Sequence, residues 1–84
     1  MTAAPDAIAA EILRQTAARG PDKSICPSEV ARALAPDAWR PLLGAVRAEA
    51  LRLAEAGRID ILRKGRPVPP DAVRGVIRLR TRTP

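Results

Sequence analysis

The sequence predicts an α+β fold, a winged helix-turn-helix in which three helices pack with a small antiparallel sheet and a β-hairpin wing closes the chain. Three observations lead to this prediction. Two helical segments are joined by only Pro36-Asp37, and two short strand patterns follow the last helix. Residues 58–84 carry eight basic and two acidic residues (8 − 2 = +6), whereas residues 1–57 carry seven of each sign. Charge and architecture therefore change together at Gly57.

Length and composition set the first limits. We treat residues 1–84 as one domain with an ordered core from about residue 6 to residue 80, because a chain of 84 residues supports a single small core. With 46% apolar residues, the chain lies in the range that folds without metals or disulfides. No helix has an unused apolar stripe, so we expect a monomer.

The first helix is expected from about Asp6 to Arg19. Pro5 suits a first helical position, and the acidic Asp6 complements the helix dipole. Gly20-Pro21 ends the helix. Residues that follow helical spacing form its inner face: Ile8, Ile12, Leu13 and Thr16.

The second helix has the clearest start signal in the sequence, Cys26-Pro27-Ser28-Glu29. Pro27 fits the first helical position, which places Cys26 at the N-cap and Glu29 at the third position. The Glu29 carboxylate can then accept a hydrogen bond from the Cys26 amide, as in half of a capping box. Val30, Ala31 and Leu34 form the inner face, and Pro36 ends the helix.

The third helix is expected from Asp37 or Ala38 to Gly57. Pro41 lies within the first turn, where the lost hydrogen bond costs little, and the extreme N-terminus can form a separate turn. One face of the helical wheel is apolar, which makes this the central core helix and Trp39 a core anchor. That face holds Trp39, Leu42, Leu43, Val46, Ala50, Leu53 and Ala54.

Two strands are expected after Gly57, at residues 58–64 with Ile59 and Ile61 inward, and at residues 75–80 with Ile77 and Leu79 inward. Residues 65–74, between the strands, form a Pro-rich loop that is too long for a tight hairpin turn. Ser24-Ile25 is a third extended piece, too short to stand alone, and we expect it to pair in the same sheet. Thr81 to Pro84 are expected to fray.

The inventory of side chains argues against an enzyme. The chain has no histidine and no tyrosine, and the only cysteine, Cys26, has no partner base other than scattered carboxylates. Clustered ligands for zinc or iron and a Gly-rich phosphate loop are also missing, so we expect no cofactor and no metal. The N-terminus lacks a signal sequence and no apolar run reaches the length of a membrane span, so a cytoplasmic location is expected.

Short motifs along the chain also form a combined pattern: Cys26-Pro27-Ser28-Glu29-Val30-Ala31, Trp39-Arg40, Val46-Arg47, Ala50, Gly57-Arg58-Ile59, Lys64-Gly65 and Gly75-Val76-Ile77-Arg78-Leu79. This pattern resembles the bacterial domain-of-unknown-function family 3253 from about Ile8 to Arg80. The resemblance implies a small winged-helix-like bacterial protein without an established activity. It supplies no catalytic residues.

Cys26 has two interpretations. The helix dipole can lower the pKa of a thiol at a helix N-cap, and a lowered thiol pKa is a property of redox-sensing cysteines. A small, weakly polar residue can also simply cap a helix, and this structural interpretation is the one we favour.

The basic residues favour binding of double-stranded DNA with little sequence specificity. Several cations of the wing are placed to track a phosphate backbone together, and two arginines of the third helix lie at its edge. The candidate nucleic-acid-binding residues are Arg40, Arg47, Arg63, Lys64, Arg66, Arg74, Arg78 and Arg80. Alternatively, a basic hairpin is only a solvated surface whose charges prevent edge-to-edge aggregation.

The third helix is poorly equipped to read bases, because its outward face carries no Asn, Gln, Ser or Thr. Its small residues equally suit packing against another protein, so a protein-interaction or adaptor module is the alternative function. The residues of that alternative surface are Gly44, Ala45, Ala48 and Arg52. Arg52 can also pair with Glu49 or Glu55, as on an ordinary solvated helix face.

Overall fold

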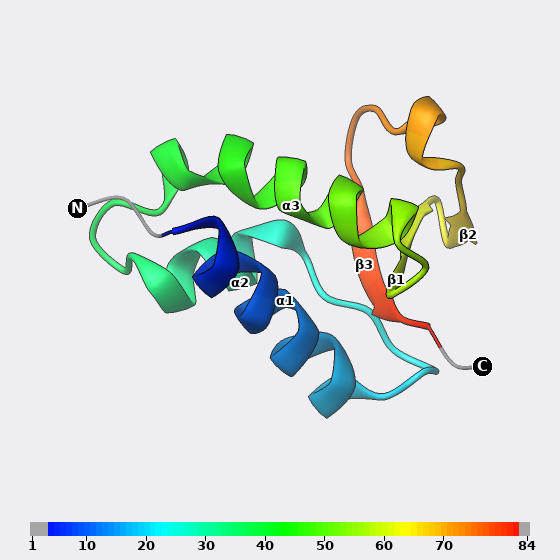
Figure 1. The fold of residues 1–84 in the computed structure, drawn as a ribbon, viewed down its shortest axis with the longest axis horizontal. Helices are drawn as coiled ribbons and strands as arrows, with labels where there is room; N and C mark the ends of the chain where they lie inside the picture. Colours follow the sequence, from blue (N-terminus) through cyan, green and yellow to red (C-terminus); the bar gives the residue numbers. More distant parts are fainter. Residues whose placement is uncertain (1–3, 83–84) are drawn as a thin grey trace.

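The computed structural model describes residues 4–82 and contains three α-helices, two short 3-10 helices and a three-stranded antiparallel sheet (Figure 1). The helices are α1 (Pro5–Arg19), α2 (Pro27–Leu34) and α3 (Leu43–Glu55), with 3-10 turns η1 (Arg40–Leu42) and η2 (Pro70–Ala72). The strands are β1 (Ile59–Arg63), β2 (Arg66–Pro67) and β3 (Arg78–Thr81). This architecture confirms the predicted α+β class and is compatible with a winged helix.

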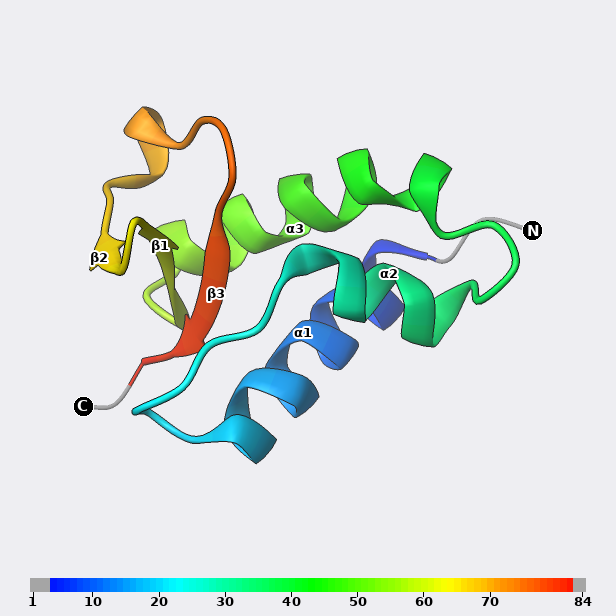
Figure 2. The same ribbon diagram turned by 180° about the vertical axis from the view of Figure 1, so that it is seen from behind.

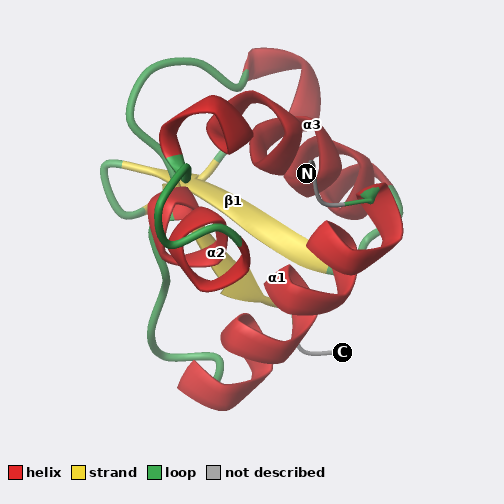
Figure 3. Cartoon of the chain, turned by 90° about the vertical axis from the view of Figure 1, so that its left-hand side faces the viewer, coloured by secondary structure: helices red, strands yellow, loops and turns green. Residues whose placement is uncertain are grey.

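The three helices and the sheet enclose one core. Figures 1 and 2 show α3 running along the long axis, with α1 and α2 on one side of it and the sheet at its C-terminal end. Viewed along that axis, β1 lies behind the helices (Figure 3). Every element contributes to the buried apolar cluster except β2 and the 3-10 turn η2. Its largest fully buried side chains are Ile8, Ile12, Ile25, Val30, Val46, Ile59, Ile61 and Leu79.

The start of α2 matches the sequence prediction. The amide of Cys26 donates to Oε2 of Glu29 at 2.7 Å, and Pro27 occupies the first helical position. Glu29 also binds α1, because Arg19 Nη2 donates to its Oε1 at 3.0 Å. Gln15 Nε2 donates to the backbone oxygen of Glu29 at 3.2 Å. Glu29, at the third position of α2, therefore both stabilises the start of α2 and fixes it against α1.

The end of α3 is a Schellman motif built on Gly57. Gly57 has a φ of 75°, and its amide donates to the carbonyl of Ala54 at 3.0 Å. The Arg58 amide donates to the carbonyl of Leu53 at 2.9 Å. This hydrogen-bond pair is the usual way to satisfy the last carbonyls of a helix, and its left-handed residue favours glycine. Chain direction turns here from α3 into β1.

The strand order is β2-β1-β3, with antiparallel pairing throughout. Ile59 lies opposite Thr81 and Leu62 opposite Arg78 in the β1–β3 register. Ile25 extends the sheet beyond β3 through a bridge to Leu79, which confirms that the short segment before α2 finds a partner strand. The predicted inward residues of both strands, Ile59, Ile61, Ile77 and Leu79, are all buried.

The prediction of one long open loop between the two strands is wrong. Lys64 and Gly65 form a two-residue turn, with φ values of 52° and 79°, which joins β1 to the additional strand β2. Positive φ at both central residues is the requirement of a type I′ hairpin turn. The rest of the loop contains η2, and Val68 and Val73 pack against the core. The connection is therefore folded back onto the domain.

Smaller differences concern boundaries. The second long strand begins at Arg78, not at Gly75, and includes Thr81, which was expected to fray. Residues 83–84 of that expectation lie outside the described residues. The segment before α3 is the separate turn η1, and Trp39 is half-buried at the edge of the core instead of within it.

Gly44 within α3 and Gly57 after its C-terminal end provide a matched test of this backbone conformation. Gly57→Ala is expected to lower the free energy of unfolding by about 1 kcal/mol, because alanine must adopt a left-handed φ. Gly44→Ala is expected to raise it by up to about 1 kcal/mol, since Gly44 is helical and an added Cβ meets no heavy atom within 4 Å. Urea unfolding measures both; equal effects of the two substitutions would contradict the motif.

Candidate nucleic-acid interface

Two arginines from different elements hold the segment that leads into β3. Arg47 of α3 donates from Nη1 to the carbonyl of Gly75 at 3.1 Å. Arg63 of β1 donates from Nη1 to the carbonyl of Arg74 at 3.4 Å. Gly75 has a φ of 70°, a left-handed conformation that favours glycine, and the guanidinium of Arg63 lies beside it. Both acceptors are neutral, and both guanidinium groups therefore keep a full charge.

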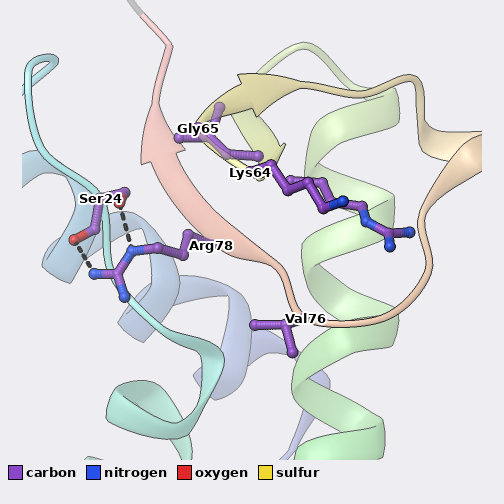
Figure 4. A pocket seen from close by; sticks show the side chains of 7 residues that line it. Ser24, Lys64, Gly65, Val76 and Arg78 are labelled. Carbon is purple, nitrogen blue, oxygen red and sulfur yellow. Dashed lines mark hydrogen bonds between the residues drawn. The ribbon is translucent and has the colours of Figure 1, made fainter.

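A third arginine is fixed in the same way on the neighbouring strand. Arg78 donates from Nε to Oγ of Ser24 at 2.7 Å and from Nη2 to the backbone oxygen of Ser24 at 2.9 Å. Figure 4 shows this side chain reaching from β3 to the segment before α2. Ser24 offers no negative charge, so the positive charge of Arg78 also remains uncompensated.

Lys64 and Arg74 complete the group. Lys64 occupies the exposed β1–β2 turn, next to Arg63 in the chain, and Arg74 is an exposed residue whose carbonyl binds Arg63. We name the five residues Arg47, Arg63, Lys64, Arg74 and Arg78 the wing cluster. Within residues 4–82, no carboxylate lies within 4.0 Å of a cationic nitrogen of these five side chains. Arg66, on β2, is exposed beside this cluster, since it pairs with Arg63 across the turn.

Two predicted residues have other partners. Arg80 Nη2 donates to Oδ2 of Asp60 at 3.3 Å, and Arg82 Nε lies 3.5 Å from Oδ1 of the same carboxylate. Arg40 lies at the far end of α3, where its guanidinium carbon is 5.0 Å from the centroid of the Trp39 ring. The structure thus brings five of the eight predicted cations together with Arg66 beside them, and leaves Arg40 and Arg80 apart.

The sequence analysis did not predict which groups accept hydrogen bonds from these cationic side chains. Asp60, Ser24 and the carbonyls of Arg74 and Gly75 were not predicted to bind these cations. Asp60 and Arg80 carry opposite charges and lie opposite each other in the β1–β3 register, which is the one signal that sequence patterning offers. The contacts of Arg47 and Arg78 span 28 and 54 residues of sequence and leave no local signal.

The outward face of α3 is only partly as predicted. Gly44 and Ala48 are exposed, whereas Ala45 is half-buried and packs against the core. Arg52 donates from Nη2 to Oε1 of Glu49 at 2.7 Å, and this hydrogen bond raises the pKa of Arg52 above its usual value. The exposed small residues of this face are therefore Gly44 and Ala48, and Arg52 is exposed but paired.

Cys26 is half-buried, and its sulfur accepts a hydrogen bond from the Ser28 hydroxyl at 3.1 Å. This contact fits the structural interpretation of a residue that caps α2. Among residues 4–82, no three His, Cys, Asp or Glu side chains gather in an arrangement suited to a metal ion. In the same part of the chain, no helix has the length and apolar character needed to cross a membrane.

Two comparisons with known proteins complete this description. No curated protein matches the chain. A family model described as "Protein of unknown function (DUF3253)" matches residues 5–82, which includes all three helices, the sheet and the wing cluster. The chain therefore belongs to the DUF3253 family.

Proposed function

We propose that this protein binds double-stranded DNA with low sequence specificity, as a winged helix whose wing cluster contacts phosphates while α3 approaches the major groove. The observation that carries the proposal is the wing cluster itself, five cations from α3, β1, β3 and the loop without a carboxylate partner. Uncompensated cations at one surface are the electrostatic footprint of a nucleic-acid-binding protein.

The geometry supports phosphate contacts more than base reading. Arg47, Arg63 and Arg78 are held by neutral acceptors at 2.7 to 3.4 Å, so their charged groups are ordered before a ligand arrives. Arginine presents several donors, and those not used by the protein remain free for phosphate oxygens. Backbone contacts fix a protein on a duplex but carry no sequence information.

The surface of α3 that faces outward lacks side chains that discriminate between bases. Gly44 and Ala48 offer no hydrogen-bonding group, and the guanidinium of Arg52 is paired with Glu49. These small residues allow a close approach to the floor of a groove without selecting a sequence. A protein partner on this face remains the alternative, and the same small residues would then contact it. That the protein is a cytoplasmic monomer without enzymatic activity stays a prediction from its sequence.

Salt dependence tests the proposal directly. Fluorescence anisotropy with a 20-base-pair duplex should show saturable binding at about 50 mM salt and a log K against log salt slope near −3.6, if about four phosphates are neutralised. Two duplexes of unrelated sequence should bind with affinities within about threefold, because phosphate contacts are the same for every sequence. The absence of saturable binding at about 50 mM salt would end the DNA proposal.

Exposed cations can be removed without touching the fold. Arg66→Gln and Arg74→Gln are each expected to weaken DNA binding about five- to tenfold at 0.1 M salt and to reduce the slope by about 0.9, because one phosphate contact is lost. Arg14→Gln, which removes an exposed arginine of α1, is the matched control and should leave the affinity nearly unchanged. An equal loss for Arg14→Gln would show that only net charge matters.

The approach of α3 has its own test. Ala48→Glu is expected to lower DNA affinity about tenfold and Ala48→Arg to raise it a few-fold, because Ala48 is exposed on the face that would lie nearest the duplex. The matched pair Ala17→Glu and Ala17→Arg alters an exposed alanine of α1 and should change the affinity much less. If both pairs respond equally, α3 does not face the DNA.

A further inference from the structure

The outer face of the sheet holds a pocket of about 450 Å³, lined by Ser24, Leu62, Arg63, Lys64, Gly65, Val76 and Arg78. Figure 4 shows Lys64 and Gly65 on the hairpin turn, Arg78 on β3, and Val76 on the segment that leads into β3. The volume falls within the range of about 300 to 1,000 Å³ that is typical of small-molecule sites. Nothing in the proposed DNA-binding function requires such a pocket.

The floor of this pocket is apolar. Ile59 and Ile61 of β1 face the core, so alternation places Leu62 on the outer face of the sheet. Leu62 is nevertheless only 6% exposed and does not belong to the core cluster. Its cover comes from the outer face, where Arg78 lies opposite it in the register and the aliphatic stems of long cations can shield apolar surface.

Val76 adds a second apolar group at the edge of the pocket. It is 85% exposed, and it is the large hydrophobic side chain that the described residues leave most open to solvent. The apolar side chain of Val76 gains no favourable interaction from its exposure to water. Val76 therefore presents open apolar surface beside Leu62, which is itself largely covered.

The rim of the pocket is cationic and has no counter-charge. Arg63, Lys64 and Arg78 line it, and no lining residue is acidic. Ser24 orders the Arg78 guanidinium through two hydrogen bonds without neutralising it. Asp60, the acidic residue on the same face of β1, is already engaged by Arg80 and Arg82 at 3.3 and 3.5 Å.

We propose that this pocket binds a small organic anion, a carboxylate carried on an apolar body. The cations that line the pocket attract the carboxylate, and the apolar body packs on Val76 and on the aliphatic stems of these cations. An inorganic anion leaves Val76 exposed, and an organic cation meets like charges; one ligand class satisfies both parts of the lining. The inference shares Arg63, Lys64 and Arg78 with the wing cluster, and it differs from DNA binding in its need for the apolar side chain of Val76, which has no role in that function.

An NMR titration of the full chain tests the site with sodium octanoate as the probe. Saturable amide shifts are expected at Leu62, Lys64, Gly65 and Val76. Acetate has the charge without the apolar body, and octylammonium has the body with the opposite charge; both are expected to bind at least tenfold more weakly. Unsaturable octanoate shifts, shifts confined to other residues, or equal binding of octylammonium would each overturn the proposal.

Two substitutions separate the parts of the site. Lys64→Asn removes a cation while keeping a residue that tolerates the positive φ of the turn, and Val76→Asp places a carboxylate at the exposed edge. Both are expected to weaken octanoate binding about five- to tenfold. Arg58→Gln removes an exposed cation at the other end of the hairpin. Arg58 does not line the pocket, so this substitution should leave octanoate binding unchanged. If Arg58→Gln weakens octanoate binding as much as Lys64→Asn, the ligand responds to net charge and the site is excluded.

The outcome is distinguishable from that of the DNA experiments. According to the proposed function, Arg66→Gln weakens DNA binding. Arg66 does not line the pocket, so the same substitution should change octanoate affinity by no more than about twofold. Val76→Asp, at a residue with no role in the DNA proposal, is expected to weaken octanoate binding about five- to tenfold. Failure of one titration therefore leaves the other proposal standing.

Discussion

The antiparallel bridge between Ile25 and Leu79 is the interaction on which the rest of the structure depends. The Ile25 amide donates to the Leu79 carbonyl and the Leu79 amide to the Ile25 carbonyl, both at 2.8 Å, and both side chains are buried. β3 thereby lies between β1 and the segment before α2, and joins the helical part of the chain to the basic part. Because side chains alternate along a strand, burial of Leu79 turns Arg78 to the opposite face, where Ser24, the neighbour of Ile25, receives it.

Whether an ordered arginine keeps its net positive charge depends on the type of group that accepts its hydrogen bonds. A carboxylate partner orders an arginine and cancels its charge, as Asp60 does for Arg80. A carbonyl or hydroxyl orders an arginine and leaves the charge in place, as at Arg47, Arg63 and Arg78. Ordered cations bind an anion without the loss of side-chain entropy that a free long side chain suffers. These three arginines of the wing cluster are therefore more ordered than the side chains of a solvated basic hairpin, although they carry the same charge.

Local signals in the sequence were sufficient for much of the fold and for little of the site. The cap of α2, the apolar face of α3 and the stop at Gly57 each depend on residue type and spacing. The β1–β2 hairpin was missed because Lys64 adopts a left-handed φ that lysine seldom takes, and Pro67 argued against a strand although it is tolerated at an edge. Arg47 and Arg78 find their acceptors only through tertiary packing, which no local pattern encodes.

The low sequence specificity that we propose for DNA binding follows from where the polar groups lie. A bidentate side chain that reads a base pair contributes about 1 to 3 kcal/mol of discrimination, and the open surface of α3, at Gly44 and Ala48, has no such group. Arg40 is held beside Trp39 at the end of the helix, and Arg52 is held by Glu49. In the complex that we propose, phosphate contacts from the wing cluster contribute equally on every sequence. The proposed duplex is then held by ordered charges next to a helix face whose small residues do not choose between bases, and any preference comes from the shape of the DNA.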